Sequence, residues 1–258
     1  MAGPARPPRG QGSGVRGELS GLHPPAAILF DMGGVLLSMA GTQGLPQSQA
    51  DFRGRRALLG MLRDRGGRLG LDDLERLLFR PWQAEYERRY ERGHEASWDP
   101  HFQRLRRATG ARGRTLDFLR TWFEPYAEGL QAAAGAGEAL EHLRRRGVRV
   151  GLVSNVPLPG VLYQRILKRA GLWRYLEDAR FSYDEGSRKP SPAMLRSAMS
   201  ALDVPPRRTW MVGDRRASDV TAGLAAGVYT VWLQSAHRQG PRPDATIQSL
   251  AELTALVR

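Results

Sequence analysis

The chain has 258 residues, of which 41% are hydrophobic and 25% are charged, proportions typical of a globular protein with a buried core. It contains no cysteine, which excludes disulfides, thiolate metal sites and cysteine nucleophiles and is compatible with a reducing cytoplasm. The net charge of +13 comes almost entirely from arginines scattered along the chain, and we expect these to attract phosphorylated small molecules rather than to form a nucleic-acid surface.

The N-terminal stretch, residues 1–25, is rich in Gly, Pro and Arg. Such a segment buries too little apolar surface to offset the entropy lost on ordering, so it is predicted to be a disordered leader. It lacks the continuous apolar core of a secretory signal, and no run elsewhere approaches the ~20 apolar residues of a membrane-spanning helix. The sequence therefore predicts a cytoplasmic protein without a membrane partner.

The first predicted strand is the apolar run from Ala26 to Phe30, and an aspartate follows it. Asp31 precedes Met-Gly-Gly-Val, so its carboxylate stands at the carboxyl end of a strand, at a glycine turn. This is a favoured place for a nucleophile or a metal ligand in α/β proteins. On this segment alone, an aspartate that caps a turn is an equally good interpretation.

A long helical stretch follows the first strand. Between Gln49 and Glu128 the apolar residues recur at helical spacing, as in Leu58-Leu59-Met61-Leu62. This pattern predicts an all-helical cap, residues 41–132, inserted after the first strand. Its aromatic side chains are expected to pack in the core of the cap rather than to contact a substrate.

Strands and helices alternate after Ala133, which predicts a parallel sheet covered by helices on both faces. The predicted strands are Val148–Val153, Ala179–Ser182, Thr209–Val212 and Val228–Leu233, and the helices between them are predicted at 158–170, 192–202 and 218–226. The expected fold class is α/β, with a Rossmann-like parallel-sheet core, residues 26–40 and 133–258, interrupted by the helical cap.

Polar residues stand at the ends of the predicted core strands. Ser154 and Asn155 follow one strand, while Asp214 follows another and precedes Asp219 by five residues. Because the carboxyl ends of parallel strands lie along one edge of the sheet, these side chains are expected to converge with Asp31. Taken singly, the serine also suits a helix N-cap, and the two later aspartates suit a turn and a helix start.

The ordered set of motifs resembles the haloacid dehalogenase-like hydrolase superfamily: Asp31 after a strand, then Ser154-Asn155, Arg188-Lys189-Pro190, and Asp214 with Asp219. The resemblance implies that Asp31 is a nucleophile forming an aspartyl-phosphate. It also implies a Mg²⁺ ion bound by Asp31, Asp214 and the main-chain carbonyl of Gly33. Asp219 is then expected to hold a ligand or Lys189 in place.

The same resemblance implies a phosphate site made by Ser154, Asn155 and Lys189. Lys189 is one of only two lysines in the chain, and a compact ammonium there would neutralise both the nucleophile and the transferred phosphate. The expected activity is hydrolysis of a small phosphorylated metabolite, with sugar phosphates as the default substrate.

Gly33 departs from the common pattern, because most phosphatase relatives carry there a second aspartate that acts as general acid and base. Loss of such help typically slows a reaction by a factor on the order of 10²–10⁴. A cap histidine (His94 or His101), a water or the substrate itself are alternative sources of the proton. A catalytically weak or inactive phosphate-binding protein with the same fold is the alternative function.

Overall fold

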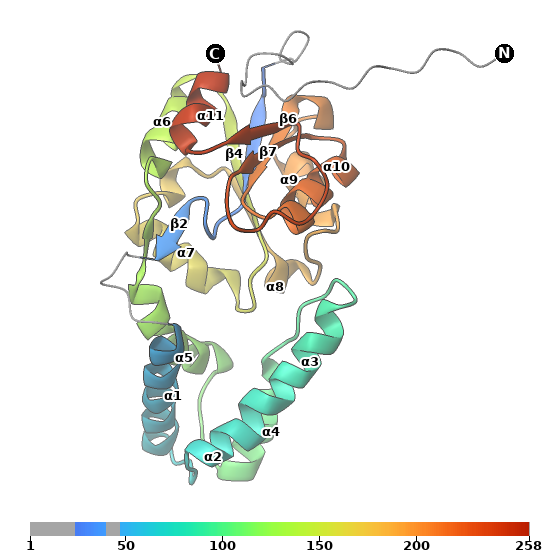
Figure 1. Ribbon diagram of the computed structural model, residues 1–258. Helices are drawn as coiled ribbons and strands as arrows, with labels where there is room; N and C mark the ends of the chain where they lie inside the picture. Colours follow the sequence, from blue (N-terminus) through green and yellow to red (C-terminus); the bar gives the residue numbers. More distant parts are fainter. Residues whose placement is uncertain (1–23, 40–46, 258) are drawn as a thin grey trace, which may run out of the picture.

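The structure is a computed structural model that describes residues 24–39 and 47–257, so nearly all of the predicted leader lies outside the described residues. Its main sheet is parallel throughout, in the order β5-β4-β1-β6-β7-β8 (Figure 1). The strands are β1 (Ala27–Phe30), β4 (Arg149–Ser154), β5 (Asp178–Phe181), β6 (Thr209–Gly213), β7 (Tyr229–Leu233) and β8 (Ala245–Ile247).

Helices cover both faces of this sheet, as predicted. Side chains alternate along β1, so that Ile28 and Phe30 pack on one face and Ala27 and Leu29 on the other. The first face is covered by α6 (Ala136–Arg145), α7 (Gly160–Arg169) and α11 (Leu250–Leu256), and the second by α9 (Ala193–Ala201) and α10 (Thr221–Ala226). The α/β fold class is therefore confirmed.

Shorter elements connect these strands and helices. They are η2 (Trp173–Tyr175), α8 (Ser182–Glu185), η3 (Pro206–Arg208) and η4 (Arg216–Val220). The predicted helix 218–226 is in fact the π-helical turn η4 followed by α10. β8 and α11, which extend the sheet at its β7 edge and cover it, were not predicted from the sequence.

A helical segment lies between two short strands that leave and re-enter the core. These strands, β2 (Leu37–Met39) and β3 (Leu130–Ala132), pair antiparallel and were not predicted. Between them come α1 (Gln47–Asp64), α2 (Leu71–Leu74), η1 (Glu75–Phe79), α3 (Arg80–Tyr90), α4 (Asp99–Thr109) and α5 (Thr115–Glu128). We call residues 47–128 the cap; they lie to one side of the sheet in Figure 1.

Aromatic and leucine side chains form the interior of the cap. Trp98, Phe102 and Phe118 are fully buried, and the rings of Phe102 and Phe118 stack at 5.4 Å between centroids. The helical spacing read from the sequence thus corresponds to real helices around an apolar interior. Within the described residues, none of the helices has the length and apolar character needed to cross a bilayer.

Candidate active site

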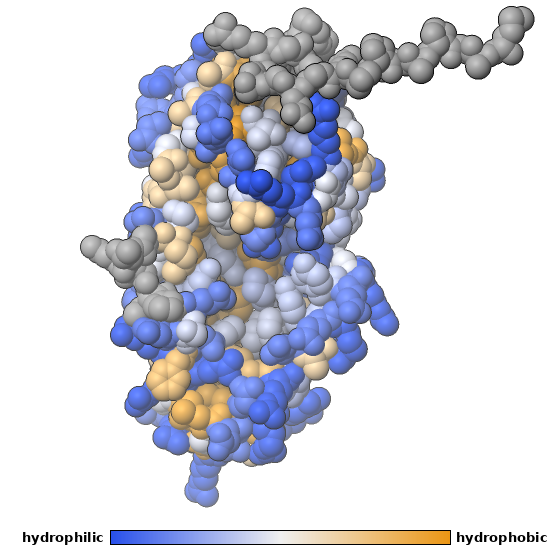
Figure 2. Space-filling view, in the orientation of Figure 1, coloured by the Kyte–Doolittle hydropathy of each residue, from blue (hydrophilic) through white to orange (hydrophobic). Residues whose placement is uncertain are grey.

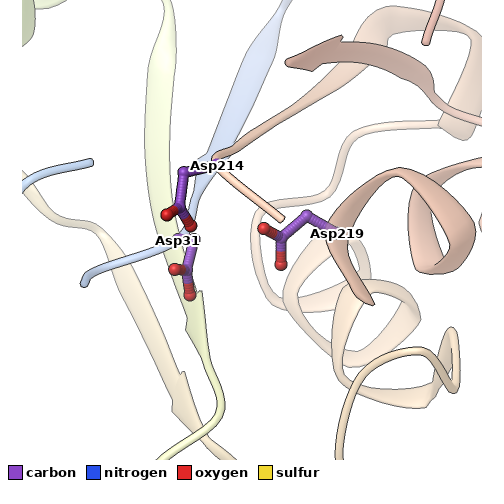
Figure 3. A group of neighbouring side chains, drawn as sticks. All are labelled: Asp31, Asp214 and Asp219. Carbon is purple, nitrogen blue, oxygen red and sulfur yellow. The ribbon is translucent and has the colours of Figure 1, made fainter. Parts of the chain in front are cut away.

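Three neighbouring strands bring polar side chains to one edge of the sheet. Asp31 follows β1, Ser154 ends β4 and Asp214 follows β6, and β1 lies between the other two strands. Asp219 joins them from η4, and the three aspartates each offer a carboxylate oxygen within 4.8 Å of the others (Figure 3). The predicted convergence of these residues, which lie far apart in the sequence, is therefore present in the structure.

Lys189 is the cation at the centre of this group. Its ammonium donates hydrogen bonds to Asp31 Oδ1 and to the Val153 carbonyl, each at 2.7 Å, and forms an ion pair with Asp219 Oδ1 at 2.8 Å. Burial lowers the pKa of Lys189, but the charges of Asp219 and Asp31 outweigh burial and raise it, so the ammonium stays charged. Burial raises the pKa of Asp31, and the same ammonium opposes that rise.

Asn155 fixes the backbone of Lys189. Its amide nitrogen donates to the Lys189 carbonyl and its amide oxygen accepts from the Lys189 N–H, both at 2.8 Å. The side chain expected to bind phosphate is thus engaged with the segment that carries the ammonium, a contact the sequence did not predict. Ser154 is buried and lines the same cavity as Asp31.

Asp219 has both carboxylate oxygens occupied by protein donors. Oδ2 accepts the backbone N–H of Arg215 at 2.9 Å, and Oδ1 accepts the hydroxyl of Ser218 at 3.1 Å beside the ammonium of Lys189. A Cβ at Gly213 would overlap this carboxylate, so glycine is required there by close approach. This geometry suits a carboxylate that holds Lys189 and the turn after β6 in place.

Asp214 differs from the other aspartates because part of its carboxylate lacks a protein donor. It is 7% exposed, and among the described residues no hydrogen-bond partner reaches its Oδ1. Burial, together with the charges of Asp31 and Asp219, raises the pKa of Asp214 to about 7. A buried carboxylate oxygen without a partner, next to a second carboxylate, fits a hard divalent cation such as Mg²⁺, which prefers oxygen ligands.

The two glycines after Asp31 are constrained differently. Gly34 has a φ of 75°, and a Cβ there would lie 2.7 Å from Asp214 Oδ2, so both backbone conformation and space require glycine. Gly33 lines the cavity and has no atom within 4 Å of the position a Cβ would take. A side chain at Gly33 is therefore compatible with the space around it.

The two cap histidines considered as proton donors are engaged away from the cavity. His94 Nδ1 lies 2.9 Å from the carbonyl oxygen of Gly186, and His101 Nε2 lies 2.9 Å from Glu85 Oε2. Among the described residues, the imidazole that lines the cavity belongs to His237. Its position four residues beyond the end of β7 was the sequence signal that could have identified it.

A cavity of about 1090 Å³ lies over the site and extends beneath the cap, where Figure 2 shows a hollow between the two parts of the molecule. Its core side includes Asp31, Ser154 and Lys189. Its cap side includes five aromatic residues, Tyr86 and Tyr90 from α3 and Trp122, Phe123 and Tyr126 from α5. Two of these five, Trp122 and Phe123, also pack against the apolar core, as expected of cap aromatics. Helical spacing alone did not show that these rings would also line a cavity.

Arg188 connects the cap to the segment that carries Lys189. Its guanidinium donates to the Tyr86 hydroxyl at 3.1 Å, pairs with Glu95 Oε1 at 3.2 Å and lies 3.8 Å from the centroid of the Tyr90 ring. Ser182 of the core also donates to Glu95 Oε1, at 2.7 Å. Arg188 is 7% exposed, so this is a buried ion pair between cap and core, next in sequence to Lys189.

A sequence model described as haloacid dehalogenase-like hydrolase matches residues 25–227. A pyrimidine 5′-nucleotidase of Escherichia coli is 34% identical over 117 residues, which are 44% of this chain and 51% of that protein. A ribulose-1,5-bisphosphate 5-phosphatase of Halopiger xanaduensis is 29% identical over 156 residues, 56% of this chain and 64% of that protein. The match thus spans less than two thirds of either relative.

The fold is shared with solved structures of low sequence identity. The crystal structure of a HAD phosphatase from Thermococcus onnurineus superposes with a TM-score of 0.60 at 23% identity, covering 90% of this chain and 97% of the other. At this identity the comparison supports the fold and leaves the chemistry to the residues of this site.

Proposed function

The chain belongs to the haloacid dehalogenase-like hydrolase family, and we propose that it is a Mg²⁺-dependent phosphatase of small phosphomonoesters. The observation that carries the proposal is the pairing of Asp31 with the Lys189 ammonium at 2.7 Å, beside Asp214 Oδ1, which has no hydrogen-bond partner within residues 24–39 and 47–257. Phosphoryl transfer requires a nucleophilic carboxylate, a fixed cation and carboxylate oxygens that can bind a metal ion, together in one cavity.

Asp31, Asp214 and the carbonyl of Gly33 would hold the cation in this proposal. When bound, Mg²⁺ would neutralise charge on the phosphate and lower the pKa of the surrounding carboxyl groups. Lys189, the Ser154 hydroxyl and the backbone N–H of Asn155 would bind the phosphate oxygens. The support is that these groups face one cavity, while Asp219 is occupied in holding Lys189.

The proposed reaction has two displacements at phosphorus. A carboxylate oxygen of Asp31 forms a bond to phosphorus while the ester P–O bond breaks, and its electron pair leaves with the alcohol oxygen, which then takes a proton. Water next attacks the phosphorus of the aspartyl-phosphate, and the departing oxygen restores the Asp31 carboxylate and releases inorganic phosphate. With glycine at position 33, the proton for the alcohol has no carboxyl donor there, so esters of acidic alcohols should react fastest.

The two-part organisation of the chain belongs to the same proposal. In the division predicted from the sequence, the core, residues 26–40 and 133–258, would supply the chemistry, and the insertion, residues 41–132, which contains the cap, would select the leaving group. The antiparallel β2–β3 ribbon at the crossing points and the cap residues on the cavity wall support this division. A cytoplasmic location is also proposed, on the absence of cysteine and of a signal-like apolar run.

The experiment is a hydrolysis assay on a panel of phosphomonoesters, run with Mg²⁺ and with excess chelator. We expect turnover with the metal, its loss in chelator, and its loss in Asp31→Asn, with the exposed Asp72→Asn as the matched control. Turnover that persists in chelator or in Asp31→Asn would contradict the proposal. Phosphate binding without turnover of any ester would favour the alternative of a phosphate-binding protein, which Gly33 motivates.

A further inference from the structure

The cavity has two chemically different ends. At the core end lie the charged groups Asp31, Lys189 and Asp214. At the cap end the wall is built from aromatic rings, the five of α3 and α5 named above and Tyr163 of α7. An ester bound with phosphorus at Asp31 would therefore extend its alcohol part toward the aromatic end.

The aromatic rings come from separate helices and are held in place by contacts with Trp82, with Arg188 and with one another. On α3, Tyr86 stacks on Trp82 at 5.0 Å, while Tyr90 lies under the Arg188 guanidinium and is still 52% exposed. On α5, Phe123 contacts Tyr126 at 5.5 Å, and also Tyr163 at 5.2 Å. Rings fixed in this way offer flat apolar faces without losing side-chain freedom when a ligand binds.

Polar groups accompany these rings. Burial raises the pKa of Tyr126 and of Tyr163, so both phenols remain protonated and can donate hydrogen bonds within the cavity. Exposed Arg215, His237 and Arg238 also line the cavity. Because the two phenols and these cationic side chains can donate hydrogen bonds, a ligand that matches this wall has a planar ring that carries heteroatom acceptors.

Resting on the proposed phosphatase function, we infer that the preferred substrate is a phosphomonoester whose alcohol carries a heteroaromatic ring, of the nucleoside 5′-monophosphate class. The phosphate would occupy the site of Asp31 and Lys189, and the base would stack on rings such as Tyr90 and Tyr126. The cavity volume of about 1090 Å³ accommodates such a molecule and is far larger than a phosphate with a three-carbon chain requires.

The test compares uridine and adenosine 5′-monophosphates with ribose 5-phosphate, which has the same phosphate and sugar but no base. Stacking of one base on an aromatic side chain contributes favourable binding free energy. We therefore expect kcat/KM for the nucleotides to exceed kcat/KM for ribose 5-phosphate by about tenfold or more. Tyr90→Leu and Tyr126→Leu should reduce this ratio. Phe52→Leu, at an exposed ring on α1 outside the cavity wall, should leave it unchanged.

Acetyl phosphate, which has no ring and a good leaving group, separates this inference from the function on which it rests. If acetyl phosphate is hydrolysed with Mg²⁺ but ribose 5-phosphate equals the nucleotides, the substrate class is refuted and the phosphatase function stands. If no ester is hydrolysed, the phosphatase function is refuted. The ligand class can then still be tested by measuring the affinities of uridine monophosphate and ribose 5-phosphate by calorimetry. Equal affinities for the two molecules would overturn the inferred ligand class.

Discussion

Replacing Asp214 with asparagine should stabilise the protein in the absence of metal, by an amount that depends on pH. The native carboxyl is buried near Asp31 and Asp219, and its pKa is raised from 3.8 to about 7. Because the folded state holds this proton more tightly than the unfolded chain does, the stabilisation is complete below pH 3.8 and is lost as the pH rises through 7. An asparagine at this position carries no charge and avoids that loss.

The expected magnitude follows from the pKa of Asp214. Each pH unit between the unfolded and folded pKa values corresponds to about 1.4 kcal/mol. Relative to pH values below 3.8, the metal-free protein therefore loses about 2 kcal/mol of unfolding free energy at pH 5, where only the unfolded chain is ionised, and about 4 kcal/mol at pH 8. The difference in unfolding free energy between Asp214→Asn and wild type should therefore grow by about 2–3 kcal/mol from pH 5 to pH 8.

The assay is urea unfolding followed by tryptophan fluorescence at several pH values, with a chelator present. Asp203→Asn, at an exposed aspartate, serves as the matched control and should follow wild type at every pH. Added Mg²⁺ should stabilise wild type but not Asp214→Asn, because the ion binds only the folded site of the former. A difference between Asp214→Asn and wild type that does not grow from pH 5 to pH 8 would refute this account of the buried carboxyl.

Three further predictions concern the groups around Asp31. Gly33→Asp has room for its side chain and should raise kcat on esters of weakly acidic alcohols by on the order of 10²; equal gains in Gly33→Asn would show that acid catalysis is not the cause. Asn155→Ala frees the backbone of Lys189 and should lower kcat about 10- to 100-fold while far-ultraviolet dichroism stays unchanged; unaltered kcat would argue against positioning through this contact. Arg188→Met leaves Glu95 buried without its cation and should lower the unfolding free energy by about 3–5 kcal/mol. Adding Glu95→Gln to this variant should recover part of the loss. Additive losses from the two substitutions would mean that the pair is not coupled.

The fold and the charged end of the site could be predicted because their signals are local. Asp31 follows a short apolar run typical of a buried strand, and the alternation after Ala133 predicts a parallel sheet whose strand ends share one edge. Once that edge is fixed, Asp214 must lie near Asp31, whereas the place of Lys189 was implied by the family resemblance. The short ribbon β2–β3 gave no comparable signal, since three-residue strands carry too few alternations to be recognised.

The aromatic end of the cavity was decided by tertiary structure alone. Helical spacing shows that Tyr86 and Phe123 belong to helices, but which face of each helix meets the core depends on how the cap packs across the β2–β3 crossing. The contacts of Arg188 with Glu95 and of Asn155 with Lys189 likewise join residues that only packing brings together. Local sequence thus determined which chemical groups stand at the edge of the sheet. The packing of cap on core determined which ligands the cavity can accept. This second property cannot be predicted from one segment, because long-range contacts depend on the relative orientation of the elements.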